Sequence, residues 1–244
     1  MQILTVTTYN NKLYEAYAYR FHNTYNWPFK LKVYNEDIDM YAQIPELKKF
    51  VNRNKDRYKY TSYEEKTDDY RKDGVRFCYK VYAYTHEILQ ASLAYNGIIC
   101  IDADSVFHKY IDGDWIYKNI HREDCMMTYL GRPSYSECGF LYFNMSHPQT
   151  KNFAREMQKM YNEDLIYNEK EQHDSWIWDI VRKRFEEKGV KNYNIGDNKE
   201  GHVQARSVLG PIYDHTKGRR KLSGKSPEAR VWEEFLLGMT KVKK

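Results

Sequence analysis

The segment from residue 74 to residue 101 constrains the fold of this chain more than any other part of the sequence. Side chains in its first part recur at steps of three and four and so share one face of a helix: Cys78, Val81, Tyr82, Thr85, Ile88, Leu89 and Ser92. Asn96-Gly97 is a typical helix end, and the continuous apolar run 98–101 is typical of a strand covered on both faces. The sequence therefore predicts a helix over residues 74–95 followed by a buried strand.

Strand and helix patterns alternate along the rest of the 244 residues, which predicts the α/β class and favours one domain. Strands are expected at residues 3–8, 29–34, 124–129, 139–145 and 193–195. Helices are expected at residues 13–27, 148–161 and 171–187, and Ser226-Pro227 is typical of the start of a last helix. Residues 53–73 are expected to be a surface excursion or a loop that orders on ligand binding, and residues 205–225 to be irregular.

Two features favour a soluble protein in a reducing compartment. No apolar run approaches the ~20 residues of a membrane-spanning helix, and the first residues lack the pattern of a secretory signal. The four cysteines, Cys78, Cys100, Cys125 and Cys138, show no metal-ligand spacing, and three of the four lie in apolar stretches, as reduced buried thiols do. We therefore expect a cytoplasmic protein.

The net charge of +5 is concentrated late in the chain, where residues 217–225 hold five basic and no acidic side chains. Such a cluster favours an anionic ligand. Nucleic acid is one alternative, because basic patches supply most non-specific affinity for it and the 24 tyrosines could stack on bases. The tyrosines are spread over the whole chain, however, and no known nucleic-acid-binding module is present.

Asp102 and Asp104 come directly after the predicted buried strand. Ligands of open α/β sheets bind at the carboxyl ends of the strands, so this pair stands where a site is expected. Two carboxylates one residue apart suit Mg²⁺ or Mn²⁺ that bridges to phosphate oxygens. Taken alone, the same D-x-D pattern is also a common turn signal.

A second group of polar residues lies more than a hundred residues later, where His215, Gly218 and Lys221 stand at steps of three. A neutral imidazole could complete the metal site of the two aspartates, glycine lets the backbone approach a phosphate, and lysine supplies a positive charge. The alternative is a solvated basic loop. His202 is a rival metal ligand, but no glycine and lysine follow it at that spacing.

Asp102-Ala103-Asp104 together with His215-x-x-Gly218-x-x-Lys221 resembles the D-x-D and late H-x-x-G-x-x-K motifs of the retaining glycosyltransferases of family 8, the glycogenin and galactosyltransferase group. The resemblance implies a GT-A fold, a single domain over residues 1–244 with a mostly parallel central sheet flanked by helices. Residues 1–105 would bind the nucleotide, residues 106–225 the sugar and acceptor, and residues 226–240 would form a C-terminal helix.

The resemblance also implies an activity: transfer of a sugar, with retention, from a nucleotide-diphosphate donor such as a UDP-sugar to an acceptor hydroxyl. The acceptor, a glycan, a lipid-linked group or a protein, is left open. Mn²⁺ or Mg²⁺ would be held by Asp102, Asp104 and His215. The remaining donor-binding residues that it implies are Thr7, Thr8 and Tyr9 at the nucleotide, Arg76 and Lys80 at the donor, and Gly218 and Lys221 at the diphosphate.

Two further segments correspond to the family pattern. Where the family often has F-N-S-G, this chain has Ser136-Glu137-Cys138-Gly139. The acidic or amide pair that the family places near a helix start corresponds to residues 171–175, and the resemblance assigns Gln172 and Asp174 there as the catalytic, sugar-facing residues. The alternative for this segment is an ordinary helix N-terminus, where acidic residues are favoured by the helix dipole.

Two other function classes remain open at this point. A sugar-phosphate nucleotidyltransferase also combines a sheet with a metal-binding aspartate, but residues 7–11 contain no glycine for a phosphate loop. A non-catalytic anion-binding or nucleic-acid-binding protein would use the basic cluster 217–225 instead.

Overall fold

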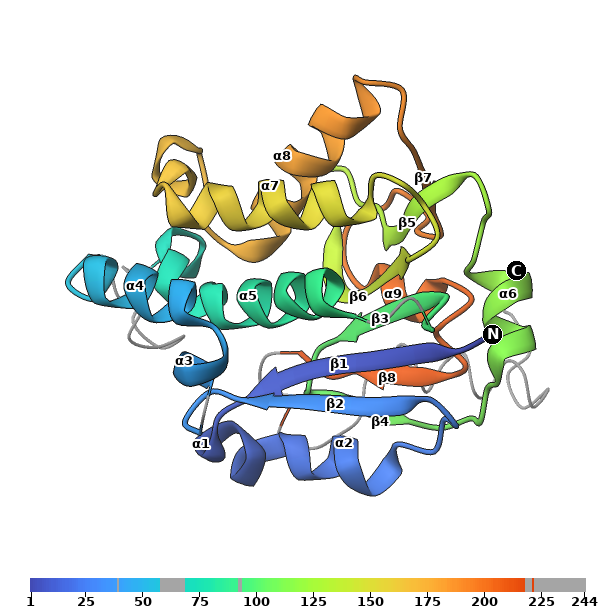
Figure 1. Ribbon diagram of the computed structural model, residues 1–244. Coiled ribbons are helices and arrows are strands. Elements are labelled where there is room, and N and C mark those ends of the chain that lie inside the picture. Colours follow the sequence, from blue (N-terminus) through green and yellow to red (C-terminus); the bar gives the residue numbers. More distant parts are fainter. Residues whose placement is uncertain (39, 58–68, 92–93, 218–220, 222–244) are drawn as a thin grey trace.

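A computed structural model describes residues 1–38, 40–57, 69–91, 94–217 and 221. Its centre is a six-stranded sheet in the order β2-β1-β3-β6-β5-β7 (Figure 1). The strands are β1 (Ile3–Tyr9), β2 (Lys30–Asn35), β3 (Gly97–Ile101), β5 (Cys125–Leu130), β6 (Glu137–Asn144) and β7 (Lys191–Asn194). Only β6 runs against the other five strands of this sheet, because it pairs antiparallel with both β3 and β5. The α/β class and the mostly parallel sheet predicted from the sequence are therefore confirmed.

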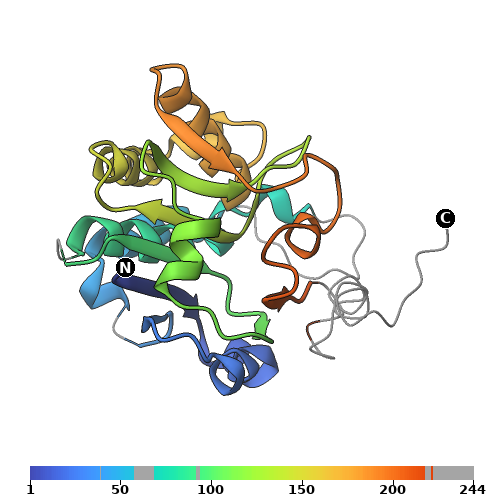
Figure 2. The same ribbon diagram turned by 90° about the vertical axis from the view of Figure 1, so that its right-hand side faces the viewer.

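Helices cover both faces of this sheet. Figures 1 and 2 show the long helices α5 (Gly74–Gln90), α7 (Thr150–Asn162) and α8 (Asp174–Glu186) on one side and α2 (Tyr19–Thr24) on the other. The shorter helices of the described chain are α1 (Asn11–Leu13), α3 (Met40–Gln43), α4 (Pro45–Asn54), α6 (Gly113–Asn119) and α9 (Val203–Arg206). A π-helical turn, Tyr14–Ala18, joins α1 to α2, and 3₁₀ turns lie at Tyr70–Lys72 and Leu165–Asn168.

The continuous apolar run of β3 follows from burial on both faces. Ile98 and Cys100 point into the core shared with α5, α7 and α8, whereas Ile99 and Ile101 point into the core on the side of α2 and α6. All four side chains are fully buried. Because successive residues of a strand face opposite sides, a strand with two covered faces must be apolar at every position.

Helix α5 begins where the sequence predicts and ends earlier. The Asp73 carboxylate accepts a hydrogen bond from Arg76 N at 3.0 Å and caps the N-terminus. The helix ends at Gln90 rather than near residue 95, because Ala91 takes an extended ψ of 134°. None of the helices that the structure describes is long and apolar enough to cross a membrane.

A small second sheet, which the sequence analysis missed, carries part of the site. Strand β4 (Ser105–Phe107) pairs antiparallel with β8 (Tyr213–His215). Strand β8 lies within residues 205–225, the stretch expected to be irregular. Each strand has three residues, too few for a periodic pattern to be visible in the sequence. The predicted last helix, residues 226–240, lies outside the described residues. The single domain expected over residues 1–244 stays a prediction.

Candidate active site

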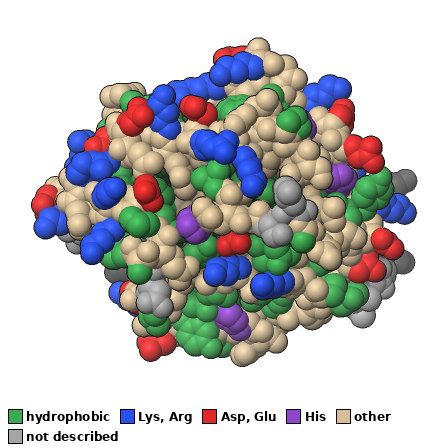
Figure 3. All heavy atoms as spheres, viewed as in Figure 1, with side chains coloured by type: hydrophobic (Ala, Val, Ile, Leu, Met, Phe, Trp, Pro, Cys, Tyr) green, Lys and Arg blue, Asp and Glu red, His purple; other side chains and the backbone are tan. Residues whose placement is uncertain are grey.

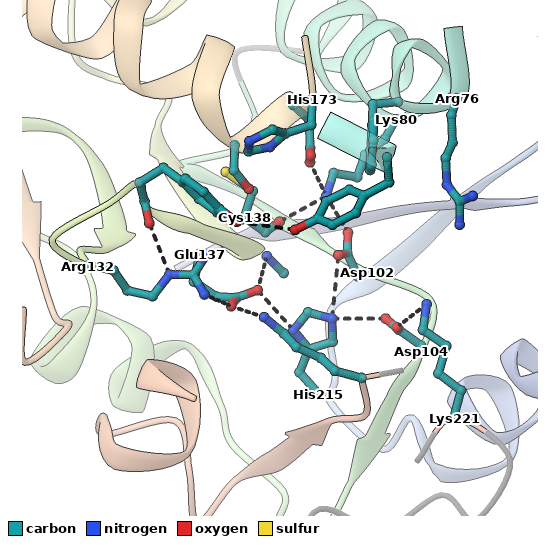
Figure 4. Close-up of a pocket in the computed structure, with 17 residues that line it drawn as sticks. Arg76, Lys80, Asp102, Asp104, Arg132, Glu137, Cys138, His173, His215 and Lys221 are labelled. Atoms are coloured by element: carbon teal, nitrogen blue, oxygen red, sulfur yellow. Dashed lines mark hydrogen bonds and ion pairs between the residues drawn. The ribbon is translucent and has the colours of Figure 1, made fainter. Parts of the chain in front are cut away.

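A cavity of about 320 Å³ opens at the carboxyl end of β3. Its walls come from α5, from the segment after β3, from the start of β6, from the start of α8 and from the end of β8 (Figure 4). This is the edge of the sheet at which ligands of open α/β folds bind. The cavity is therefore the candidate active site.

Asp102, Asp104 and His215 converge at this cavity although the histidine is more than a hundred residues away in the chain. The pairing of β4 with β8 sets Ser105 opposite His215 and so brings the imidazole beside the aspartates. His215 Nε2 lies 3.1 Å from Asp104 Oδ1 and 3.5 Å from Asp102 Oδ2. One potential ligand atom from each of the three residues lies within 4.8 Å of the others.

The next residue after His215 fixes this arrangement from the backbone. Thr216 donates two hydrogen bonds to the Asp104 carbonyl oxygen, from its N–H at 2.9 Å and from its hydroxyl at 2.6 Å. Thr216 is buried, so these bonds are shielded from water. The D-x-D turn and the residue after β8 are thus tied together directly beside the imidazole.

Two lysines pair with the aspartates. Lys80 Nζ, from α5, lies 2.8 Å from Asp102 Oδ1 and 2.5 Å from Asp174 Oδ2. Lys221 Nζ lies 2.8 Å from Asp104 Oδ2 and 4.8 Å from the centre of the Tyr17 ring (Figure 4). Asp102 and Asp104 therefore each have one oxygen toward a lysine and the other toward His215.

Burial and charge act against each other on these groups. Burial lowers the pKa of His215, but Asp104 and Glu137 outweigh it and raise the value to about 9. Burial raises the pKa of Asp102, and Lys80 and His215 oppose this effect only in part. For Asp104, His215 and Lys221 outweigh burial and lower the pKa. The histidine and the lysines thus supply the positive charge that the buried carboxylates need.

The donor set fits a divalent metal ion. Two carboxylate oxygens and one imidazole nitrogen are ligands that suit Mn²⁺, and the oxygens also suit Mg²⁺. All three side chains lie at the wall of one cavity, which leaves further coordination positions to a ligand. Such an ion would take over the neutralising role that the His215 proton plays among the described groups.

The other residues predicted for the site divide into two groups. Arg76, Lys80, Asp174 and Lys221 line the cavity together with the three candidate metal ligands. Gln172 does not line it, because its side chain donates a 2.8 Å hydrogen bond to the Glu169 carbonyl, away from the metal cluster. Gly218 lies outside the described residues. The roles assigned to these residues from the sequence stay predictions.

Thr7, Thr8 and Tyr9 end β1 at the same edge of the sheet but do not line the cavity. Thr7 is fully buried. The Thr8 hydroxyl donates to the Tyr34 carbonyl at 2.9 Å, and the Tyr9 hydroxyl lies 2.6 Å from His22 Nε2. The rival histidine, His202, precedes α9 and does not line the cavity either.

Several cavity residues were missed by the sequence analysis: Arg132, Tyr135, Glu137, His173 and Lys217. His173 is buried and stacks edge-on against Tyr135, with ring centres 4.5 Å apart. Glu137 was noted only as a departure from the family pattern. Lys217 belongs to the basic cluster, and its pairing with Glu137 shows that this part of the cluster faces the cavity.

No protein-family model and no curated protein sequence matches this chain. Among solved structures, the apo form of mouse xyloside xylosyltransferase 1 is similar, with a TM-score of 0.51 and 8% identity over 93% of this chain and 100% of that chain. Galactosyltransferase LgtC, in complex with donor and acceptor sugar analogues, reaches a TM-score of 0.46 at 11% identity over 99% of this chain and 98% of that chain. The glycosyltransferase GlyE of Streptococcus pneumoniae TIGR4 reaches 0.44 at 12% identity over 80% of this chain and 46% of that chain.

The fold assignment rests on the first of these structures. At 8% identity the likeness shows a shared fold only, and that fold is the GT-A fold predicted from the sequence. The resemblance to family 8 continues to rest on the sequence motifs.

Proposed function

We propose that this protein is a metal-dependent glycosyltransferase that moves a sugar from a nucleotide-diphosphate donor, a UDP-sugar by resemblance, to an acceptor hydroxyl with retention. The observation that carries the proposal is the convergence of Asp102, Asp104 and His215 in one cavity at the carboxyl edge of a GT-A sheet. The D-x-D aspartates and the late histidine were paired from sequence motifs, and the structure brings the three side chains together.

The charges around the cluster support a diphosphate ligand. Lys80 and Lys221 flank the aspartates, and Arg76 and Lys217 also line the cavity. A bound Mn²⁺ or Mg²⁺, held by Asp102, Asp104 and His215, would supply neutralisation of the charge that develops on the leaving diphosphate. Lys221 can then bind a phosphate oxygen in place of Asp104 Oδ2, because the metal compensates the carboxylate.

The protein's own contribution in this proposal is to position the reactants and to stabilise charge. The acceptor hydroxyl attacks the anomeric carbon from the side that the diphosphate leaves, so the bond to the acceptor forms as the bond to the phosphate oxygen breaks. The leaving phosphate takes the proton of the hydroxyl. Asp174 borders the cavity beside Lys80 and is the carboxylate proposed to face the sugar ring.

Thermal unfolding with a panel of nucleotide-diphosphate sugars, each with and without Mn²⁺, tests the proposal. A donor at a hundred times its dissociation constant stabilises the folded state by about 2.7 kcal/mol, which raises the midpoint by roughly 5–10 °C for a chain of this size. We expect the right donor to produce such a rise over the protein without donor only when Mn²⁺ is present. No shift with any donor would contradict the proposal.

The Asp104→Asn variant, studied in the same experiment, tests the metal site directly. It removes the charge of the aspartate closest to His215, so we expect no donor-dependent shift and no release of sugar from the donor. Asp124→Asn is the matched control, since Asp124 is an exposed aspartate whose partner is Lys191. Near-normal turnover by a folded Asp104→Asn protein would remove the metal-site assignment.

The nucleic-acid-binding alternative is disfavoured by one observation. Lys217 and Lys221, the described lysines of the basic cluster, pair with Glu137 and Asp104 inside the cavity. Basic and acidic side chains are also interspersed on the face drawn in Figure 3, rather than separated into one basic patch. Steep salt dependence of nucleic-acid binding, without stabilisation by donor and metal, would favour this alternative.

A further inference from the structure

Glu137 is a buried carboxylate at the start of β6 to which the proposed function gives no role. Its side chain is 4% exposed and lies in the wall of the cavity, behind His215 as seen from the aspartates (Figure 4). Ionised carboxylates are buried only where other groups compensate them. The groups around Glu137 therefore indicate what it does.

Glu137 contacts the side of the His215 ring that the aspartates do not use. Glu137 Oε1 lies 3.3 Å from Nδ1, whereas both aspartates approach Nε2. The two ring nitrogens point in diverging directions, so Glu137 cannot share a metal ion with Asp102 and Asp104 through this imidazole. An acceptor at Nδ1 holds the proton there and leaves the lone pair of Nε2 for a metal.

Two cations hold the second oxygen of Glu137. Lys217 Nζ contacts Oε2, and Arg132 Nη1 lies 3.4 Å from the same atom. Two cationic side chains in contact with one carboxylate compensate the charge of Glu137 in its buried position. The carboxylate is therefore charged, and Oε1 remains directed at the imidazole.

The backbone at Glu137 is also fixed. Ser136, the residue before it, donates from its N–H and its hydroxyl to the Asp179 carboxylate at 2.9 and 2.6 Å. On the other side, the Gly139 N–H lies 3.3 Å from Glu137 Oε1. A Cβ at Gly139 would lie 2.2 Å from two atoms of the His215 ring, so the ring packs directly on the glycine backbone. The ring is therefore confined between the backbone of β6 and the two aspartates.

We propose that Glu137 is a positioning residue that orients the His215 imidazole and presents its Nε2 to the divalent metal ion. This inference rests on the proposed metal-dependent function. Hydrogen-bonded carboxylates behind metal-binding histidines raise the basicity of the ligand and fix its ring, and their loss weakens metal binding by about 10–100-fold.

Mn²⁺ binding to the full chain, measured by electron paramagnetic resonance of the free ion without any donor, tests the inference. We expect Glu137→Gln to weaken Mn²⁺ binding by about 10–100-fold, because the amide no longer compensates the ring charge and can turn its NH₂ toward Nδ1. Glu163→Gln, on the exposed residue after α7, is the matched control and should bind Mn²⁺ like the unmodified protein.

Glu137→Asp provides a second variant that keeps the charge facing Lys217 and Arg132. The shorter side chain cannot maintain both the cation contacts and the contact with Nδ1, so we expect weaker Mn²⁺ binding with an unchanged unfolding midpoint. Mn²⁺ affinity within about twofold of the unmodified protein in folded Glu137→Gln or Glu137→Asp would overturn the inference alone. Absence of Mn²⁺ binding by the unmodified protein would overturn both the inference and the proposed function.

Discussion

At the scale of single residues, Glu36 shows that polar chemistry at the carboxyl edge of the sheet extends beyond the cavity. It follows β2 and accepts hydrogen bonds from Asn10 Nδ2 at 3.1 Å and from the Thr8 hydroxyl at 3.4 Å. Burial raises the pKa of Glu36 to about 7, against the opposing effect of these two hydrogen bonds, and the neighbouring Asp37 adds to the increase. The charged form is therefore poorly stabilised in the folded protein.

Glu36→Gln should make the protein more stable at pH 8 but not at pH 4.5. Because the folded-state pKa of Glu36 lies above the ordinary glutamate value of 4.5, its contribution to stability is present below pH 4.5 and is lost as the pH rises to about 7. Glutamine cannot ionise, so we expect a gain of about 1–2 kcal/mol at pH 8, reduced by imperfect hydrogen bonding. Urea unfolding at both pH values measures it, with Glu156→Gln, on an exposed residue in the middle of α7, as the control. An equal effect at both pH values would contradict the prediction.

The sequence motifs predicted that Asp102, Asp104 and His215 would lie together, and they do, but the motifs did not indicate the residues around this cluster. Asp102, Asp104 and His215 were found because D-x-D and the late histidine are motifs whose chemistry is visible in one sequence. Glu137 has no such pattern, since its role depends on Lys217 and His215 reaching it from a segment about eighty residues away. Gln172 and Asp174 were predicted together, yet of the two only Asp174 lines the cavity, because Asp174 begins α8 whereas Gln172 precedes the helix and its side chain bonds the Glu169 carbonyl.

At the scale of elements, α8 joins the cavity to the core through a buried polar network. Asp174 begins the helix at the cavity, and Asp179, one turn further on, binds both Ser136 and Arg182. Arg182 also pairs with Glu186 at 2.7 Å. The helix therefore anchors the start of β6 through Asp179 while it presents Asp174 to the site.

Asp179→Ala should destabilise the fold by about 2–4 kcal/mol, because Nε and Nη2 of Arg182 and the N–H and hydroxyl of Ser136 lose their buried acceptor, while Glu186 still holds Nη1 of Arg182. Urea unfolding followed by circular dichroism measures the loss. Adding Arg182→Met to Asp179→Ala removes the buried guanidinium donors that lost their acceptor and should restore part of the stability. A loss below about 1 kcal/mol for the single variant would show that the network contributes little.

Elements with long periodic patterns were predicted well, and short ones were not. The seventeen-residue helix α5 and the apolar strand β3 show their burial in the sequence. The expected helix over residues 13–27 is divided into α1, a π-helical turn and α2, and the local pattern gives no signal of that division. Strand β8 exists through its pairing with β4, a contact across more than a hundred residues that no local pattern encodes.

At the scale of the whole molecule, the sheet separates two cores, and three of the four cysteines lie in the core that the sheet shares with α5, α7 and α8. Cys78 and Cys100 lie in the core shared with α5, α7 and α8, and both are completely buried. Cys125 opens β5 and is only partly buried. All four cysteines are free, as the sequence analysis expected.

Alkylation by iodoacetamide at pH 8 should modify Cys125 first in the folded protein. Burial raises the pKa of Cys78 and Cys100 well above that of a free thiol, so these two side chains have neither access to the reagent nor a reactive thiolate. Burial raises the pKa of Cys125 as well, but its sulfur can meet the reagent without unfolding. Cys78 and Cys100 should react only as fast as the two-sided core opens, which urea accelerates. Peptide mass spectrometry over a time course measures each site, and modification of Cys78 or Cys100 at the rate of Cys125 without denaturant would contradict the closed core on which the site is built.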